Sequence, residues 1–312
     1  MDSATVWQFE TLATCLVCPS TRFQPVFERV IRAVPLRFVR CAGCGLVFQN
    51  PRLTREALAH YFSSSTFIKD SGAGESALRE QLGYYDYLAW DESYRRTAHL
   101  RLKRLKRFRP PPGLLLEIGT ATGSFLDEAR GAGFTVRGLD VSATFASMAR
   151  DRYGLDIEVA FVEDADLPES TYDVVCNFGG VACWRDPLRG LENVRRTLKP
   201  DGVFVLNHPN IEGLVGRVLG AGYPEFNHAS LTVFSNQTMR RCLESAGFRV
   251  LYSQNERQYA SFGRIVTYLR SRAGVAFARA LSLDRRIIPV IAFGTTFAIC
   301  GPLGASRRQV LR

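Results

Sequence analysis

The sequence predicts an α/β protein built on a doubly wound parallel sheet, and two observations lead to this fold class. The apolar run 114–118, bounded by the prolines 110–112 and Gly113, is typical of a buried strand. The turn 119–123 after it contains glycines and leads into a helix from Ser124. Further along the chain, short apolar runs alternate with helical segments, and this alternation requires right-handed crossovers between parallel strands.

The same alternation gives the expected boundaries of each element. Strands are expected at 114–118, 134–139, 157–160, 172–177, 203–207 and 249–253, and helices at 124–132, 143–153, 187–198 and 236–246. In a sheet of this kind, ligands bind across the carboxyl ends of the strands.

Three features at these strand ends predict a site for an adenosine-containing cofactor. The glycines of the turn 119–123 let the backbone approach a ligand, and the following helix presents free N–H groups. Asp140 ends the second strand, where a carboxylate accepts hydrogen bonds from two ribose hydroxyls. Glu117 would repel the pyrophosphate of a dinucleotide but attract the ammonium and sulfonium groups of S-adenosylmethionine. The charge at Glu117 therefore favours S-adenosylmethionine.

Between residues 114 and 250 the sequence resembles the class I S-adenosylmethionine-dependent methyltransferases. The matching segments are Glu117-Ile-Gly-Thr-Ala-Thr-Gly123, Gly138-Leu-Asp-Val-Ser142, Tyr172-Asp-Val-Val175, Leu198-Lys-Pro-Asp-Gly202, Pro209-Asn210 and Ser245-Ala-Gly-Phe248. The resemblance implies a Rossmann-like, seven-stranded sheet. Ala121 departs from the family, which usually has its middle glycine there.

The turn and the strand ends together give the candidate cofactor-binding residues. Phe161, Val162 and Glu163 stand where an apolar clamp and an acceptor for the adenine amino group belong. The full set is Glu117, Gly119, Thr120, Ala121, Gly123, Phe125, Asp140, Val141, Phe161, Val162, Glu163, Asn177 and Phe178.

Two CxxC pairs near the start of the chain predict a structural zinc site. Cys15 and Cys18 form one pair, and Cys41 and Cys44 form the other. Four thiolates complete a tetrahedral zinc site and leave no open position, so this zinc would not be catalytic. A ribbon of this kind resembles a subgroup of the same methyltransferases that carries a zinc-binding N-terminus.

The candidate catalytic residues follow the fifth strand. An acceptor oxygen or nitrogen that carries a proton needs a base, and histidine is the usual one. His208 follows that strand directly, and the loop after it contains Tyr223 and His228. The resemblance places an acceptor-side histidine at the position occupied here by Ser230, so His228 would have to be moved into this role by the loop. Catalysis by alignment alone stays an alternative.

We divide the chain into four parts. These are a zinc ribbon (1–52), a helical lid or linker (53–109), the S-adenosylmethionine-binding α/β core (110–256), and a basic, apolar C-terminal part of helices and a last strand (257–312). The lid would use aromatic residues between 82 and 90, and the last strand is expected at 308–312. The uncharged run 287–305 between arginine pairs suits helices over the acceptor site or contact with a membrane surface.

Composition narrows the choice of partner and compartment. The net charge is +10, it is carried almost entirely by arginine, and its excess is concentrated in the runs 95–109 and 257–312. These runs form either a basic solvent-exposed face or a site for an anionic substrate or a membrane surface. The lack of aromatic residues interleaved with them argues against nucleic acid. The first ten residues lack the features of a signal peptide, so we expect a cytoplasmic protein. The sequence predicts a methyltransferase for a small molecule or a glycan. An RNA methyltransferase and a non-catalytic partner that only binds the cofactor stay open as alternatives.

Overall fold

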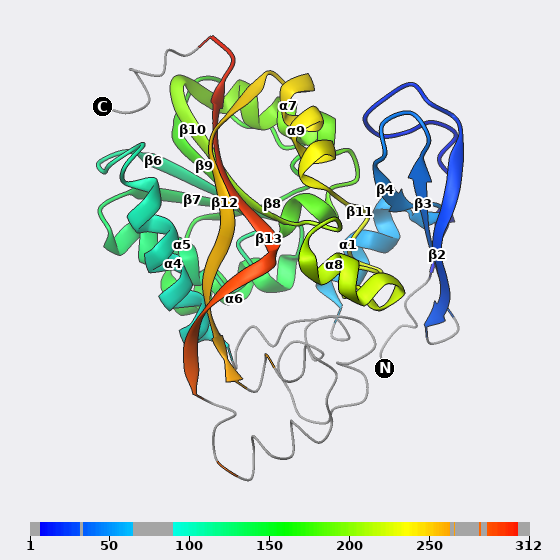
Figure 1. The fold of residues 1–312 in the computed structure, drawn as a ribbon. Helices are drawn as coiled ribbons and strands as arrows, with labels where there is room; N and C mark the ends of the chain where they lie inside the picture. Colours follow the sequence, from blue (N-terminus) through cyan, green and yellow to red (C-terminus); the bar gives the residue numbers. More distant parts are fainter. Residues whose placement is uncertain are drawn as a thin grey trace.

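A seven-stranded sheet forms the centre of the molecule (Figure 1). The computed structural model describes residues 7–31, 34–64, 90–262, 265, 281 and 286–304. Within them the strand order is β12-β13-β10-β9-β6-β7-β8, and only β13 runs antiparallel to its neighbours. The strands are β6 (Leu114–Ile118), β7 (Thr135–Asp140), β8 (Ile157–Val159), β9 (Tyr172–Phe178), β10 (Leu198–Pro209), β12 (Phe248–Ser261) and β13 (Ile287–Pro302). The predicted fold class is confirmed.

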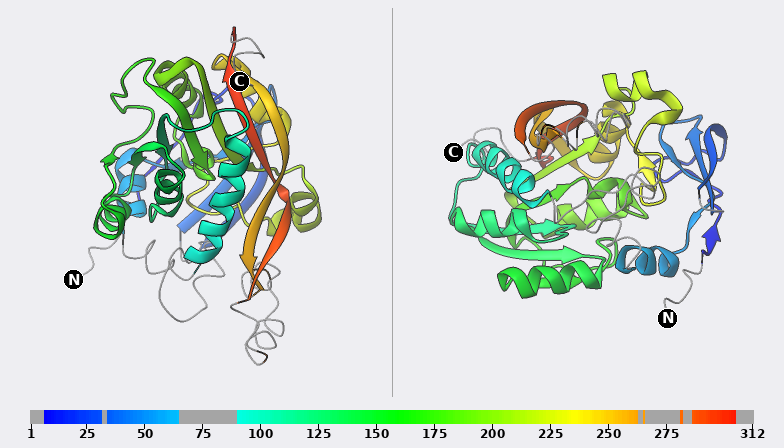
Figure 2. Two further views of the ribbon diagram at one scale, coloured as in Figure 1. Left: turned by 90° about the vertical axis from the view of Figure 1, so that its left-hand side faces the viewer. Right: turned by 90° about the horizontal axis from the view of Figure 1, so that it is seen from below.

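Helices cover both faces of this sheet (Figure 2). Helices α4 (Asp91–Leu105), α5 (Ser124–Gly131) and α6 (Ala143–Tyr153) pack on one face, and α7 (Pro187–Thr197) and α9 (Asn236–Ser245) pack on the other. Apolar side chains alternate between the two faces, so that Leu115 contacts the first group and Leu116 the second. The four predicted core helices are confirmed, with boundaries that differ by one residue at most.

Side chains that cap the helices explain why these helices begin where they do. Ser142 accepts from the backbone N–H of Phe145 at the start of α6, and Asp186 accepts from Arg189 at the start of α7. These caps satisfy backbone donors that the first turn leaves without partners. As a result, the loops that precede α6 and α7 are held at the edge of the sheet where the strands end.

The N-terminal part forms a second, smaller sheet with the order β11-β4-β3-β2. It contains β2 (Phe23–Ile31), β3 (Val34–Cys41) and β4 (Val47–Gln49), and its fourth strand is β11 (Thr232–Val233) from the core sequence. A short pair, β1 (Phe9–Glu10) with β5 (Arg52–Leu53), precedes α1 (Arg55–Ser63), whose first turn is capped by the side chain of Thr54. The small sheet is therefore completed by the core, and we call residues 7–53 the N-terminal module.

The expectation for residues 257–312 was wrong in its described part. Helices were expected there, with a last strand at 308–312, but β12 continues to Ser261 and residues 287–302 form β13. The run is rich in isoleucine, valine, threonine and phenylalanine, which favour strands. Part of β13 lies between β10 and β12. A strand inside a sheet that is covered on both faces can be apolar along its whole length, without polar residues at every second position.

Two other expectations fall outside the described residues. They concern the aromatic lid, which includes Tyr84, Tyr85 and Tyr87, and the strand at 308–312. Among the helices that the structure does describe, none has the length and apolar character needed to cross a membrane.

Candidate functional site

The turn between β6 and α5 adopts the backbone that the glycines predicted. Gly119 and Gly123 have φ angles of +77° and +80°, in the region that favours glycine. A side chain at Gly123 would also collide with Leu155, because a Cβ built there lies 2.7 Å from Cδ1 of that residue. Ala121 has a φ of +46°, so the departure from the family's glycine places strain on the backbone itself.

Asp140 closes this turn from the end of β7. Its Oδ2 accepts from the backbone N–H of Ala121 at 2.8 Å and from the hydroxyl of Thr120 at 3.5 Å, and its Oδ1 accepts from the N–H of Ser142 at 2.8 Å. Burial raises the pKa of Asp140, while these hydrogen bonds act in the opposite direction. The carboxylate thus holds the turn and the start of α6 together at the predicted ribose position.

Glu117 lies near the end of β6 and is buried. Burial raises its pKa well above the usual range, and the nearby positive charge of Arg101 acts in the opposite direction. The Oε2 atom of Glu117 has no hydrogen-bond partner. The Arg101 guanidinium stacks 4.0 Å from the ring of Phe178, which meets Phe125 edge-on at 4.6 Å between ring centroids. Glu117 is therefore a buried acceptor with one oxygen available to a cationic donor.

The predicted adenine end lies after β8. Phe161 and Val162 are buried, and the guanidinium of Arg55 from α1 lies 4.4 Å from the Phe161 ring. Glu163 accepts from the backbone N–H of Asp186 at 3.0 Å through Oε1, whereas its Oε2 has no partner. Burial raises the pKa of Glu163. Val141 packs at the margin of the same cluster of apolar side chains as Phe161.

The side chain of Asn177 is occupied within the protein. It donates to the carbonyl of Ile118 at 2.9 Å and accepts from the N–H of Val181 at 2.7 Å. These bonds tie the end of β9 to the end of β6 and to the short 3₁₀ turn η1 (Gly180–Cys183). Asn177 therefore acts on the site indirectly, because its side chain holds the backbone of Ile118 and Val181 in place at the edge of the site.

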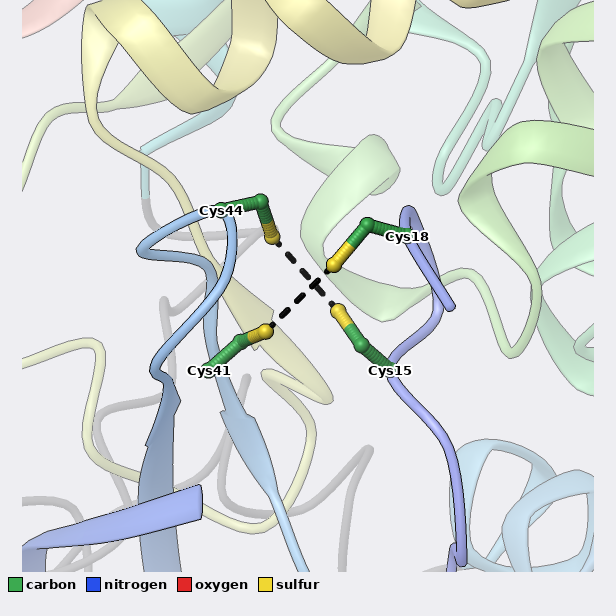
Figure 3. Close-up of side chains that lie close together, drawn as sticks. All are labelled: Cys15, Cys18, Cys41 and Cys44. Carbon is green, nitrogen blue, oxygen red and sulfur yellow. Dashed lines mark hydrogen bonds between the residues drawn. The ribbon is translucent and has the colours of Figure 1, made fainter. Parts of the chain in front are cut away.

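The four predicted zinc ligands converge on one point (Figure 3). Their Sγ atoms all lie within 4.8 Å of one another, with Cys15 and Cys44 3.6 Å apart and Cys18 and Cys41 3.5 Å apart. These separations are far longer than a disulfide bond. A tetrahedron with Zn–S bonds of about 2.3 Å has sulfur–sulfur edges of about 3.8 Å, so the four thiols fit a zinc ion.

The candidate catalytic residues lie on β10 and in the loop after it, and their surroundings differ. His228 is 1% exposed, neither of its ring nitrogens has a partner, and its ring lies 5.2 Å from that of Trp7. Burial lowers the pKa of His228 to about 4. His208 is also buried on β10, and its Nδ1 lies 3.0 Å from the carbonyl of Pro209. Tyr223 packs among apolar residues of β3 and β4, and its ring meets that of Phe226 edge-on at 6.0 Å between centroids.

Sequence reasoning missed Glu225 in this loop. Burial raises the pKa of Glu225 to about 7, and the hydroxyl of Ser230, which donates to its Oε2 at 3.3 Å, acts in the opposite direction. Burial raises the pKa of the Cys183 thiol, and the charges of Glu225 and Asp140 add to this increase, so the thiol lies near both carboxyl groups. A single glutamate in a loop carries no sequence signal, since only the folded loop encloses it.

Sequence reasoning also missed Gln49, which holds this loop from the N-terminal module. Its side-chain amide donates to the carbonyls of Asn227 and Ser230, both at 2.8 Å, and its backbone N–H donates to Leu231 at 2.9 Å. Gln49 is 1% exposed. The loop that carries Glu225 and His228 is thus anchored to β4.

Comparison with known proteins agrees with this geometry. A family model described as a methyltransferase domain matches residues 90–253. A probable S-adenosylmethionine-dependent methyltransferase of Mycolicibacterium smegmatis is 31% identical over 141 residues, which cover 44% of this chain and 52% of that protein. An uncharacterised protein of Methanocaldococcus jannaschii is 29% identical over 140 residues, or 43% of this chain and 54% of its own length. The chain spans about half the length of the curated relatives it matches.

Solved structures share the fold at low sequence identity. A chain from the complex of the Haloferax volcanii Trm112 methyltransferase activator with a methyltransferase matches with a TM-score of 0.55 and 18% identity, covering 77% of this chain and 98% of that one. The [4+2]-cyclase SpnF matches with a TM-score of 0.53 and 16% identity, covering 78% and 94%. Because a cyclase shares the fold, the fold alone does not define the reaction.

Proposed function

This chain belongs to the methyltransferase-domain family, and we propose that it transfers the methyl group of S-adenosylmethionine to a small molecule or a glycan. The observation that carries this proposal is a pair of buried carboxylate oxygens without partners, Oε2 of Glu117 and Oε2 of Glu163. A buried acceptor without a donor costs about 1–3 kcal/mol, so each position favours a ligand that brings a donor. S-adenosylmethionine carries one at each end, the ammonium of its methionine part and the amino group of adenine.

The residues around these two oxygens fit the rest of the cofactor. Asp140 has capacity for ribose hydroxyls beside the bonds that it already makes, because a carboxylate offers about four lone-pair positions. Phe125 in the first turn of α5 meets Phe178 at the end of β9 edge-on. Arg101, whose charge acts on Glu117, lies over the Phe178 ring. A sulfonium at this edge of the sheet would benefit from the aromatic ring of Phe125. The bound cofactor would supply an activated methyl group, and the protein would align the acceptor with it and exclude water.

Calorimetry with the demethylated product tests cofactor binding directly. We expect S-adenosylhomocysteine to bind with a Kd in the micromolar range, which corresponds to about −8 kcal/mol, and NAD to give no detectable heat. The physical reason is the Glu117 Oε2, a buried acceptor without a donor, which an ammonium group satisfies and the acceptor oxygens of a pyrophosphate do not. Equal binding of NAD and S-adenosylhomocysteine would contradict the assignment of the cofactor.

We also propose that Cys15, Cys18, Cys41 and Cys44 hold a structural zinc ion. The convergence of four thiols within 4.8 Å supports it. Because all four positions of a tetrahedral ion would be filled by protein sulfur, the role of this metal is to stabilise the N-terminal module and the loop that the module anchors.

A small acceptor agrees with the enclosure of the loop at 223–230. His228 is 1% exposed, so a group that reaches it must enter a closed site rather than lie on a surface. If the acceptor loses a proton, this loop offers two bases, His228, selected from the sequence, and Glu225, found in the structure. Glu225 is the better match to a reaction near neutral pH, because its pKa is about 7.

The two bases predict different pH profiles. With Glu225 as the base, the rate should increase about tenfold per pH unit below pH 7 and level off above it, because only the carboxylate accepts a proton. With His228 as the base, the rate should already be flat from pH 6 to 8, since its pKa is about 4. Once an acceptor is known, we expect Glu225→Gln to lower kcat about 100-fold and to remove the pH dependence near 7. A profile in Glu225→Gln identical to that of the wild type would reject Glu225.

A further inference from the structure

Large apolar side chains gather on the surface where the short helix α8 (Leu214–Leu219) meets β13. Nine large hydrophobic residues are exposed in the described part of the chain, and four of them lie in these two elements. Leu214 and Val218 are 61% and 73% exposed on α8, and Ile291 and Phe293 are 47% and 54% exposed on β13. We call these four residues the apolar patch. Isolated exposed hydrophobics are ordinary, but a contiguous group indicates an interaction surface.

The geometry makes the patch one continuous surface. The backbone N–H of Asn210 donates to the carbonyl of Gly294 at 2.8 Å, which fixes the segment before α8 to β13. Gly294 has no side chain, and a Cβ built there would lie 2.8 Å from Cβ of Val215, so α8 packs directly on the strand. Leu214 and Val218 are four residues apart and therefore share one face of the helix.

The strand half of the patch projects beyond the central sheet (Figure 1). β13 pairs with β10 only from Thr295 onward, whereas residues 287–292 pair with β12 alone within the described chain. Ile291 lies directly opposite Arg257 in this antiparallel pair, so the two side chains emerge on the same face. The projecting hairpin thus carries an apolar side chain and a cation side by side.

Positive charge borders the patch. Arg217 on α8, Arg257 on β12 and Arg286 before β13 are exposed, and none of them forms an ion pair with the described residues. In the described segments 212–219, 257–262 and 286–294, Glu212 is the one acidic residue. Residues 257–312 contain ten arginines against Asp284. The surface therefore combines exposed apolar side chains with an excess of cations that have no partners in these segments.

We propose that the apolar patch and its three bordering arginines dock on an anionic phospholipid membrane. Apolar side chains inserted at the depth of the headgroups and arginines beside lipid phosphates are the two contributions that hold a protein at such an interface. A nucleic acid would use the arginines but leave Leu214, Val218 and Ile291 in water. Docking would bring the site on the C-terminal edge of the sheet close to the membrane.

Flotation with lipid vesicles tests the proposal on the full-length protein. We expect the protein to bind vesicles that contain both phosphatidylglycerol and phosphatidylcholine, and salt should weaken this binding. Binding to vesicles of pure phosphatidylcholine should be at least about tenfold weaker. Phe293→Glu and Val218→Glu should each weaken binding to the anionic vesicles at least about tenfold, since each removes an apolar contact and adds a repelled charge. Arg217→Glu should do the same while leaving the apolar side chains in place.

Two controls separate a loss of docking from a loss of folding. Val159→Glu changes a side chain on β8 that is 43% exposed and distant in the sheet order, and it should bind vesicles like the wild type. All variants should keep the affinity of the wild type for S-adenosylhomocysteine, because none of these residues belongs to the candidate cofactor site. The proposal is overturned if the wild type fails to float with anionic vesicles or if Val159→Glu loses binding as much as Phe293→Glu does. It is equally overturned if the wild type forms a dimer that Phe293→Glu dissolves while vesicle binding is absent, because the patch would then serve a second copy of the chain.

Discussion

Cys41→Ser is expected to remove zinc from the protein and to unfold the N-terminal module. Three thiols cannot complete the tetrahedral zinc site that we propose for Cys15, Cys18, Cys41 and Cys44. Structural zinc contributes an apparent binding free energy of about 10–16 kcal/mol in small metal-dependent folds, which equals or exceeds the whole stability of a typical domain. The side chains that the module buries against the core, such as Leu46 and Phe48, contribute about 1.5–3 kcal/mol each, which is less than the ion contributes.

The effect should reach the candidate acceptor loop, because the module and the core share contacts. The strand β11 pairs with β4, and the Gln49 side chain donates to two carbonyls of the loop. Arg241 on α9 donates to the carbonyl of Cys44 at 3.1 Å. Cofactor binding should be weakened less, because the turn at 119–123 connects β6 with α5 and Asp140 ends β7, and these elements lie outside the N-terminal module.

Metal analysis and hydrogen exchange measure the two parts of this expectation. Wild-type protein purified without chelators should contain about one zinc per chain, and Cys41→Ser should contain none. Amide protection should disappear in β3, β4 and residues 223–233, while β6 and β9 keep theirs. Cys300→Ala is the matched control, because it removes an equally buried cysteine of β13 outside the cluster. Full protection of residues 223–233 in zinc-free protein would show that the metal does not support the loop.

The core of the fold was predictable because its elements are set by local signals. Each of these signals lies within a few positions of the element that it defines. An apolar run of four to seven residues marks a strand, a glycine with positive φ marks a turn, and a capping side chain marks the start of a helix. Asp140 and Glu117 were placed at strand ends by the same reasoning, because the end of a short apolar run is visible in the sequence. The CxxC pairs were equally clear, since the spacing within each pair brings two thiols together, and the pairing of β2 with β3 then brings the two pairs together.

The C-terminal strand was missed because its signal is ambiguous. The run 287–302 is uncharged and interrupted by prolines and glycines, and apolar periodicity cannot distinguish a strand with neighbours on both sides from a helix. Its place between β10 and β12 is decided by pairing with residues that lie between 41 positions (Asn255 with Thr296) and 96 positions (Phe204 with Cys300) away in the chain. Gln49 and Glu225 could not be predicted for a related reason. The role of Gln49 depends on its contacts with a loop far along the chain, and that of Glu225 depends on burial, and both arise only in the tertiary fold.

Asp140→Ala is expected to weaken the binding of S-adenosylhomocysteine by 100-fold or more. Two charge-assisted hydrogen bonds to the ribose would be lost, at about 1.5–3 kcal/mol each. The structure adds a second cost, because the N–H groups of Ala121 and Ser142 donate to the same carboxylate at 2.8 Å and would lose their acceptor. Ala121 already has a φ of +46°, so the turn depends on this acceptor to keep its shape.

Calorimetry on folded protein and thermal unfolding without ligand separate these two costs. Asp140→Asn should restore part of the stability lost in Asp140→Ala, since its amide oxygen still accepts from one backbone N–H, but affinity should stay low because the charge is gone. Asp156→Ala is the control, because this aspartate is 67% exposed and its pair with Arg137 at the surface contributes little. An unchanged affinity in Asp140→Ala, with the protein folded, would mean that the ribose does not bind at the end of β7. The cofactor would then have to lie elsewhere along the sheet edge, and the buried oxygens of Glu117 and Glu163 would need another donor.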